Sequence, residues 1–154
     1  MYQRILVPID GSATSNRGLD EAVKLARLTG ASLRLLHVVD AMMFATGFET
    51  YTAYAADVVP RMKAIGEQIL EQARSQVAAS GVKVDCVLFD SLAARVSDTV
   101  NEQAWAWAAD LIVIGTHGRR GVGRFLLGSD AEQILRTASV PVLLVRAPEA
   151  AALP

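Results

Sequence analysis

The chain has 154 residues, of which 52% are hydrophobic, and its 15 Lys and Arg nearly balance its 16 Asp and Glu. This length suits one compact domain, and so apolar a composition argues against intrinsic disorder. A net charge of -1 and a single cysteine argue against a general nucleic-acid binder, a disulfide framework and a Cys-rich metal site.

The first half of the chain alternates short apolar runs with amphipathic stretches. Residues 5–9 predict a buried strand, followed by a helix that begins at Ser12 or Thr14 and stops at Gly30. Residues 32–39 and 82–89 predict two further strands, and the long helix between them ends at Gly81. The expected apolar faces are Leu19, Ala22, Val23 and Ala26 in the first helix, and Val58, Met62, Ile65, Ile69, Ala73 and Val77 in the second.

The second half repeats the alternation, with strands predicted at residues 111–114 and 140–145. Strands that are apolar throughout are typical of a parallel sheet covered on both faces. We therefore expect a single-domain α/β fold, a doubly wound, Rossmann-like, five-stranded parallel sheet over residues 2–146, with a short tail at 147–154. The expected apolar faces of its last two helices are Val96, Val100, Ala104 and Trp107, and Ala131, Ile134, Leu135 and Ala138.

Export and membrane insertion are not expected. Residues 1–8 lead directly into a strand, without the apolar core and cleavage site of a signal peptide. The longest apolar runs, such as residues 111–114, are far too short to cross a bilayer. We expect a cytoplasmic protein.

A glycine-rich segment follows the fourth predicted strand and ends where the fourth helix begins. Residues 115–129 contain five glycines and finish with Ser129. Glycines let backbone N–H groups approach an anion, and a helix N-terminus adds further donors and partial positive charge. The spacing matches neither G-x-x-x-x-G-K-[ST] nor G-x-G-x-x-G. A phosphate site and a glycine-rich surface loop both remain open on spacing alone.

Four segments together resemble the universal stress protein family. They are Ile5 to Ser12, Leu36 to Val39, the spacing that joins Gly115, Gly118, Gly128 and Ser129, and Val140 to Val145. The resemblance extends over most of the chain, from about residue 2 to residue 146. It implies an adenine nucleotide alpha hydrolase-like fold and an ATP site.

The resemblance also implies a role for individual residues. Asp10 would accept hydrogen bonds from the ribose hydroxyls, with Pro8 beside it, and the backbone of Val38 would read the adenine edge. The phosphates would pass close to Gly115 and Gly118. Gly128 and Ser129 would hold the end of the phosphate tail.

One position departs from the family pattern. Asp130 follows Ser129 where relatives often carry an apolar residue, and Ala131 lacks the hydroxyl that often comes next. The carboxylate of Asp130 suits a helix N-terminus in its own right. Alternatively it holds a divalent ion, with Mg²⁺ expected beside ATP, or it weakens triphosphate binding in favour of ADP or AMP.

Several candidate residues also have a structural interpretation. Asp10 beside Gly11 is a turn former as well as a candidate ribose ligand. His117 lies in the glycine-rich segment, where it contacts phosphate or makes a structural hydrogen bond. His37 and Cys86 lie within predicted strands and are expected to be a hydrogen-bonded core histidine and a small buried apolar side chain.

The charge of the glycine-rich segment differs from that of the rest of the chain. No acid lies between Asp110 and Asp130, whereas Arg119, Arg120 and Arg124 give this stretch a charge of +3. This local excess permits one small polyanion, and Arg119 is expected to contribute to the nucleotide site.

Two further segments suggest contacts with other proteins. Met42 to Tyr54 is rich in Met and aromatic residues, and either forms a lid or partner surface or packs over the second helix. Residues 140–145 are expected at a sheet edge, where the resemblance implies a homodimer. Trp107 suits the core, whereas Trp105, two positions away, cannot share its face.

Three functions are consistent with the sequence. The first is a stress-response protein that senses or signals through bound ATP with little chemistry of its own. The second is a slow ATPase or phosphotransferase that uses the same pocket. The third is a nucleotide-free interaction module. The sequence contains no G-x-S-x-G, H-E-x-x-H or C-x-x-C motif, which favours the first.

Overall fold

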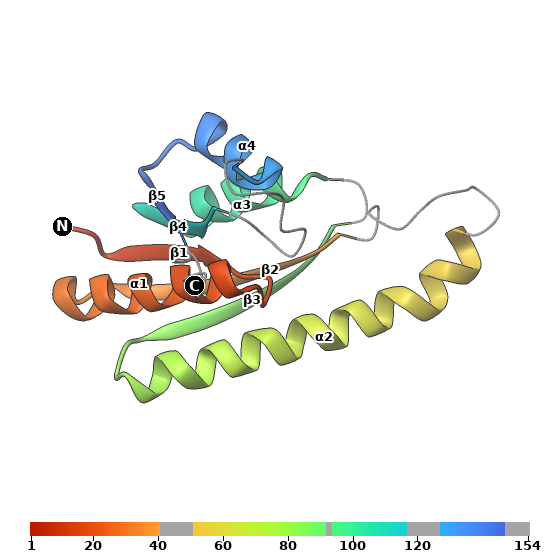
Figure 1. Ribbon diagram of the computed structural model, residues 1–154, viewed down its shortest axis with the longest axis horizontal. Coiled ribbons are helices and arrows are strands. Elements are labelled where there is room, and N and C mark those ends of the chain that lie inside the picture. The colour runs from red at the N-terminus through yellow and green to blue at the C-terminus, as the bar shows by residue number, and fades with distance from the viewer. Residues whose placement is uncertain (41–50, 92–93, 117–126, 147–154) are drawn as a thin grey trace, which may run out of the picture.

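The computed structural model describes residues 1–40, 51–91, 94–116 and 127–146 and shows a five-stranded, all-parallel sheet with four helices (Figure 1). The strand order is β3-β2-β1-β4-β5, and the winding reverses between β1 and β4. This confirms the doubly wound α/β prediction. The elements are β1 (Arg4–Pro8), α1 (Ala13–Thr29), β2 (Ser32–Asp40), α2 (Tyr51–Ala79), β3 (Val84–Ser91), α3 (Val96–Ala106), β4 (Leu111–Gly115), α4 (Ser129–Thr137) and β5 (Val142–Val145).

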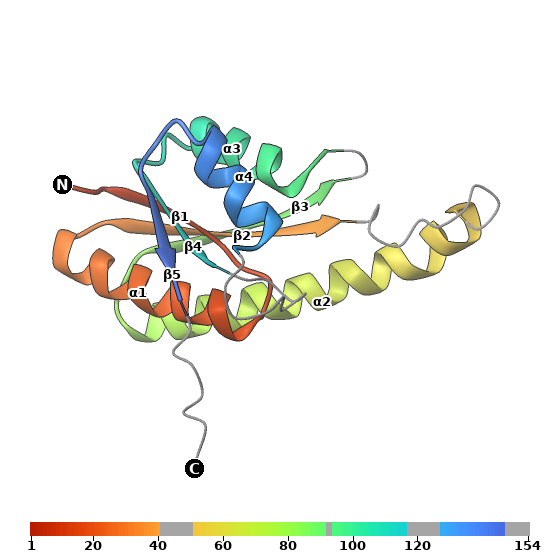
Figure 2. The same cartoon turned by 45° about the horizontal axis from the view of Figure 1, so that its top comes forward.

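Helices cover both faces of the sheet, α1 and α2 on one side and α3 and α4 on the other (Figure 2). Successive strand residues point to opposite faces, so β1 contributes Ile5 and Val7 to the first core and Leu6 to the second. Buried side chains of α1 and α2 complete the first core, and those of α3 and α4 the second. Within the described residues, no helix combines the length and apolarity that a membrane span requires.

Both ends of α1 have local causes. Ser12 is the N-cap, and its Oγ accepts a hydrogen bond from the backbone N–H of Ser15 at 3.2 Å. Gly30 ends the helix with a φ of 75°, a conformation that glycine adopts without strain. Of the two residues that the sequence offered, Ser12 and Thr14, Ser12 is the N-cap of α1.

The sequence-based account of α2 needs two corrections. The helix begins at Tyr51, inside the segment from Met42 to Tyr54 that was expected to precede it, because residues 51–56 contain no helix-breaking residue. Ile65, expected on the apolar face, is exposed. The buried positions Leu70, Ala73 and Val77 follow helical spacing, and Gly66 rather than Ile65 turns toward the sheet. Leu135 of α4 is likewise exposed, whereas Ile134 is buried.

Gly66 lets α2 approach β2 and β3 closely. A methyl group at Gly66 would lie 2.6 Å from Cδ2 of His37 and 2.7 Å from Cδ1 of Leu88. Only a residue without Cβ fits at this distance. The imidazole of His37 therefore lies directly beneath the helix backbone.

A second glycine contact joins α1 to β4. A methyl group at Gly115 would lie 2.7 Å from the carbonyl carbon of Thr14 and 3.0 Å from the backbone nitrogen of Ser15. Gly18, one turn further along α1, faces Gly115 at an ordinary contact distance, because its added methyl group would lie 3.4 Å from the Gly115 nitrogen. The first turns of α1 thus rest on the carboxyl end of β4.

The two helical glycines should respond in opposite directions to alanine. Gly66→Ala should lower the free energy of unfolding by about 1–3 kcal/mol, because the methyl group overpacks against His37 and Leu88. Gly18→Ala has room, so the better helix propensity of alanine should raise it by up to about 1 kcal/mol. Urea unfolding monitored by circular dichroism measures both. A stabilised Gly66→Ala variant would contradict the close approach of α2.

Candidate functional site

The candidate site lies at the carboxyl ends of β1, β2 and β4, where the winding reverses. In doubly wound sheets, this edge has a crevice because the adjacent connections run to opposite faces. Asp10 follows β1, Val38 lies near the end of β2, and Gly115 ends β4. The topology therefore brings three sequence-predicted residues to one edge of the sheet.

A hydrogen-bonded turn fixes the position of Asp10. The backbone N–H of Ser12 donates to Asp10 Oδ1 at 2.9 Å, and the backbone N–H of Asp10 donates to Ser15 Oγ at 3.3 Å. Gly11, between Asp10 and Ser12, has a φ of 79°. Asp10 is thus a turn former, as the structural interpretation predicted. Because this turn orders its carboxylate, the role does not conflict with ligand binding.

Pro8 and Val38 lie on the same side of the sheet. The register pairs Pro8 with Leu36, and the ladder continues with a 2.8 Å bond from Ile9 N to Leu36 O. Leu36 and Val38 both belong to the core under α3 and α4. The strand alternation places Pro8 on that face too, toward the helix that begins at Ser129.

The two ends of the glycine-rich segment, residues 115–129, are hydrogen-bonded to each other. The backbone N–H of Gly128 donates to Thr116 O at 2.8 Å, and that of Thr116 donates to Val145 O at 2.9 Å. This closure brings the start of α4 next to the end of β4. The intervening predicted residues His117, Gly118 and Arg119 lie outside the described residues.

The first turn of α4 offers backbone donors at this edge. Its N-cap is Gly128, which has no side chain to accept from the N–H groups of the first turn. Ser129 is exposed, so its hydroxyl and the adjacent N–H groups are accessible to an anion. Asp130 and Glu132 place two carboxylates in the same turn, and Glu132 pairs with Arg136 at 2.9 Å.

His37 connects the core to the site. Its Nδ1 lies 2.8 Å from the carbonyl oxygen of Ile9, the residue before Asp10, and the side chain is only 6% exposed. This confirms the hydrogen-bonded core histidine. The sequence analysis did not identify Ile9 as its partner or Gly66 as the residue above it, because these contacts join residues distant in the chain.

Cys86 shows no feature of a reactive thiol. Burial raises the pKa of Cys86, and the nearby positive charge of Arg74 only partly opposes this effect. Its Sγ lies 3.9 Å from the carbonyl oxygen of Leu70. The half-buried side chain therefore remains protonated at neutral pH and serves packing.

One hollow lies beside the Asp10 turn, and another lies at the opposite edge of the sheet. A cavity of about 420 Å³ lies between α1 and α2 and includes Asp10, Asn16 and Gln72 in its lining. A larger cavity, of about 770 Å³, lies at the amino ends of the strands. Among the described residues, no group of three His, Cys, Asp or Glu side chains is arranged to hold a metal ion.

The chain resembles known proteins over almost its whole length. The sequence profile of the universal stress protein family matches residues 1–146. A universal stress protein of Methanocaldococcus jannaschii is 31% identical over 149 residues, which cover 97% of this chain and 85% of that relative.

Two solved structures share the architecture. The universal stress protein UspA of Lactobacillus plantarum superposes with a TM-score of 0.83 at 25% identity, covering 94% of this chain and 98% of its own. A universal stress protein crystallised in complex with cAMP superposes with a TM-score of 0.64, also at 25% identity, covering 94% of this chain and 97% of its own. By its sequence match and its fold, this chain belongs to the universal stress protein family.

Proposed function

We propose that this protein binds an adenine nucleotide at the carboxyl edge of the sheet and acts as a stress-response sensor or signalling protein. The observation that carries the proposal is that the ordered Asp10 turn and the start of α4, which has no side-chain cap, both lie at the carboxyl edge of the sheet where the winding reverses between β1 and β4. The structure of a relative in complex with cAMP supports the ligand class. ATP is the nucleotide we propose, with Mg²⁺ beside its phosphates.

Each part of the nucleotide meets a suitable group in this arrangement. The Asp10 carboxylate accepts hydrogen bonds from ribose hydroxyls, with Pro8 alongside, and the backbone of Val38 meets the adenine edge. The hydroxyl and backbone N–H of Ser129 are proposed to face the phosphates, as a helix N-terminus favours anions, while the N–H of Gly128 holds the start of α4 to Thr116. Gly118, His117 and Arg119 are proposed to complete the phosphate site.

Gly115 has a packing role that is distinct from its proposed ligand contact. It admits the backbone of Thr14 at close range and so keeps the Asp10 turn beside β4. The position of Asp10, the proposed ribose-binding residue, relative to the phosphate-binding segment thus depends on this contact. We propose that Gly115 contributes to nucleotide binding through this spacing as well as by leaving room for the phosphates.

The proposed homodimer forms through β5, which is an edge strand of the sheet that the described residues form. Its Leu143 side chain is partly exposed. Unpaired backbone groups along an apolar edge strand favour pairing with another strand. The resemblance implies a two-fold dimer through this strand. We also propose that the protein is located in the cytoplasm.

Asp10 provides the first test. Asp10→Asn retains an oxygen that can accept from Ser12 N–H, so the turn should persist, whereas the charged acceptor for the ribose is lost. We expect ATP affinity, measured by isothermal titration with Mg²⁺, to fall about tenfold to a hundredfold. Asp20→Asn, which keeps an acceptor for Gln76 of α2, is the matched control and should bind normally. Undiminished binding by Asp10→Asn would refute its assigned role, and no binding by the wild type at millimolar ATP would refute the function.

Asp130 provides a test of the preferred phosphate length. If its carboxylate lies near the terminal phosphates, Asp130→Asn should strengthen ATP binding without Mg²⁺ about two- to fivefold and leave AMP binding unchanged. Glu132→Gln is the control, since the Glu132 charge is already offset by Arg136. Weaker ATP binding by Asp130→Asn only when Mg²⁺ is present would instead indicate a metal ligand, and equal effects on AMP and ATP would place Asp130 away from the phosphate tail.

Leu143 tests the dimer. Leu143→Lys places two positive charges near each other across a two-fold axis, and like charges on facing strands are destabilising. Sedimentation equilibrium should show a dimer for the wild type and a shift toward monomer for the variant. A dimer of unchanged stability would move the interface away from β5.

A further inference from the structure

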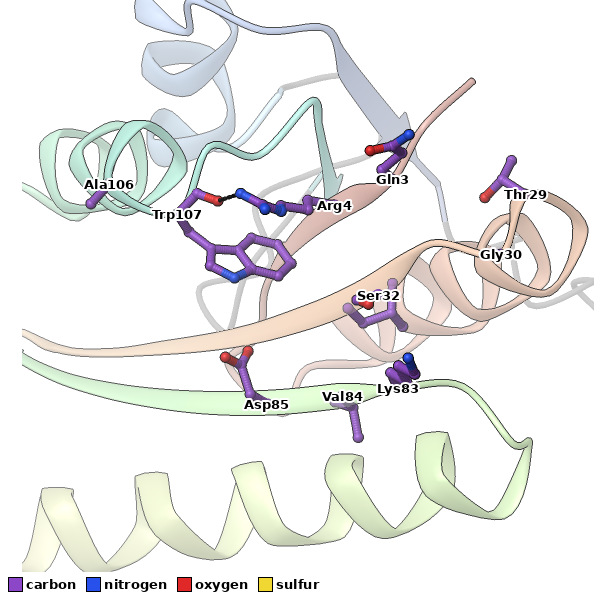
Figure 3. Close-up of a pocket in the computed structure, with 11 residues that line it drawn as sticks. Gln3, Arg4, Thr29, Gly30, Ser32, Lys83, Val84, Asp85, Ala106 and Trp107 are labelled. Carbon is purple, nitrogen blue, oxygen red and sulfur yellow. Dashed lines mark hydrogen bonds between the residues drawn. The ribbon is translucent and has the colours of Figure 1, made fainter.

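The larger cavity lies on the opposite end of the molecule from the proposed nucleotide site. It is bounded by the amino ends of β1, β2 and β3 and by the carboxyl ends of α1 and α3 (Figure 3). Its volume is about 770 Å³, and Arg4, Lys83 and Trp107 are part of its lining. This location is independent of the crevice formed by the carboxyl ends of the strands.

The cavity lining contains two cationic side chains, Arg4 and Lys83. Arg4 Nη1 donates to the carbonyl oxygen of Trp107 at 3.0 Å, so its charge meets only a neutral acceptor there. In the parts of the chain that the structure describes, neither Arg4 nor Lys83 forms an ion pair. The acid in the lining, Asp85, is already paired with Arg34, with Nη2 and Oδ2 2.6 Å apart. The lining therefore favours an anionic group.

The groups that surround the cavity are held in place before any ligand arrives. The guanidinium of Arg34 lies 4.7 Å from the ring centroid of Trp107 and contacts both carboxylate oxygens of Asp85. Asp110 accepts from the backbone N–H groups of Gln3 and Arg4 at 2.7 and 3.1 Å. Asp85, Trp107 and the backbone of Gln3 and Arg4 in the lining are thus ordered before a ligand binds.

Exposed apolar side chains are concentrated at the same end. Leu28, in the last turn of α1, is 82% exposed, and Trp105, in the last turn of α3, is 81% exposed. Met1, which precedes β1, is the third highly exposed large apolar residue of the described chain, and all others are less than half exposed. Exposed apolar side chains gathered at one end of a molecule are typical of protein interaction surfaces.

We propose that this end of the molecule is a docking surface for an acidic segment of a partner protein. A carboxylate of the segment enters the cavity between Arg4 and Lys83, and neighbouring apolar residues of the segment cover Trp105 and Leu28. Charge complementarity selects an acidic segment, and the apolar residues around the cavity select a peptide over a small anion. The surface extends the proposed signalling role by giving it a place for a partner, and it does not require that a nucleotide be bound.

The experiment uses two fluorescein-labelled peptides of seven residues, one with glutamates alternating with leucines and one with glutamines in their place. Fluorescence anisotropy with the full chain should show at least about fivefold tighter binding of the glutamate peptide, a preference that declines at high salt. Lys83→Glu should abolish this preference. Arg61→Glu, an exposed charge reversal on α2, should leave it unchanged.

Trp105→Ala tests the apolar part and localises the binding. It should weaken both peptides severalfold without changing their ratio. Because the chain contains two tryptophans, Trp107 becomes the only one in this variant, and its emission should change on titration with unlabelled glutamate peptide. ATP affinity should be the same in Lys83→Glu and Trp105→Ala as in the wild type, so loss of docking is distinguishable from loss of the nucleotide site.

Four results with the two peptides would overturn the proposal. They are no binding of the glutamate peptide at about 1 mM, equal affinities for the two peptides, an equal effect of Arg61→Glu and Lys83→Glu, and a Trp107 emission that does not respond. Binding of free N-acetylglutamate as tight as that of the peptide, with Trp105→Ala neutral, would also overturn it, because the cavity would then hold a small anion rather than a protein segment.

Discussion

The contact between Gly115 and the backbone of Thr14 is the constraint on which the arrangement of the site depends. It fixes the distance between the end of β4 and the first turn of α1, where a Cβ would meet main-chain atoms that cannot rotate away. The Asp10 turn immediately precedes this helix and is bonded to it through Ser15. The glycine-rich segment leaves β4 at the same point. One missing side chain thus determines how closely the two halves of the proposed nucleotide site approach each other.

His37 and Gly66 provide the corresponding constraint on the other side of β1. The imidazole bonds to the carbonyl of Ile9 and fills the space that Gly66 leaves under α2. The end of β1 is therefore held laterally by β2, through a side chain, as well as by the strand ladder. Together the two glycine contacts seat α1 and α2 against the strands beside the Asp10 turn.

Much of the fold was predictable because strand and helix periodicities, caps and turn glycines act locally. Ser12 and Gly30 bound α1 as expected, and β5 lies at the predicted edge. Ile65 and Leu135 were misplaced because apolar residues adjacent to a buried stripe look the same in sequence, and only the packing decides which of them turns inward. Motif and topology predict that Asp10 and the start of α4 lie at one edge of the sheet, and the structure places them there. The Gly115 and Gly66 contacts and the bond from His37 to Ile9 could not, because they join residues whose proximity only the folded chain creates.

The parallel sheet has a consequence for how the protein could combine signals. β2 carries Val38 near one end and Arg34, which holds Trp107, toward the other, on the same face of the strand and about 13 Å apart at the usual rise per residue. The two proposed sites lie at different ends of the strand, so their ligands need not compete. With both proposed sites, the chain has four occupancy states: empty, nucleotide only, acidic segment only, and both. The nucleotide concentration and the partner concentration set their populations independently. A partner that recognised only the doubly occupied state would respond as a coincidence detector.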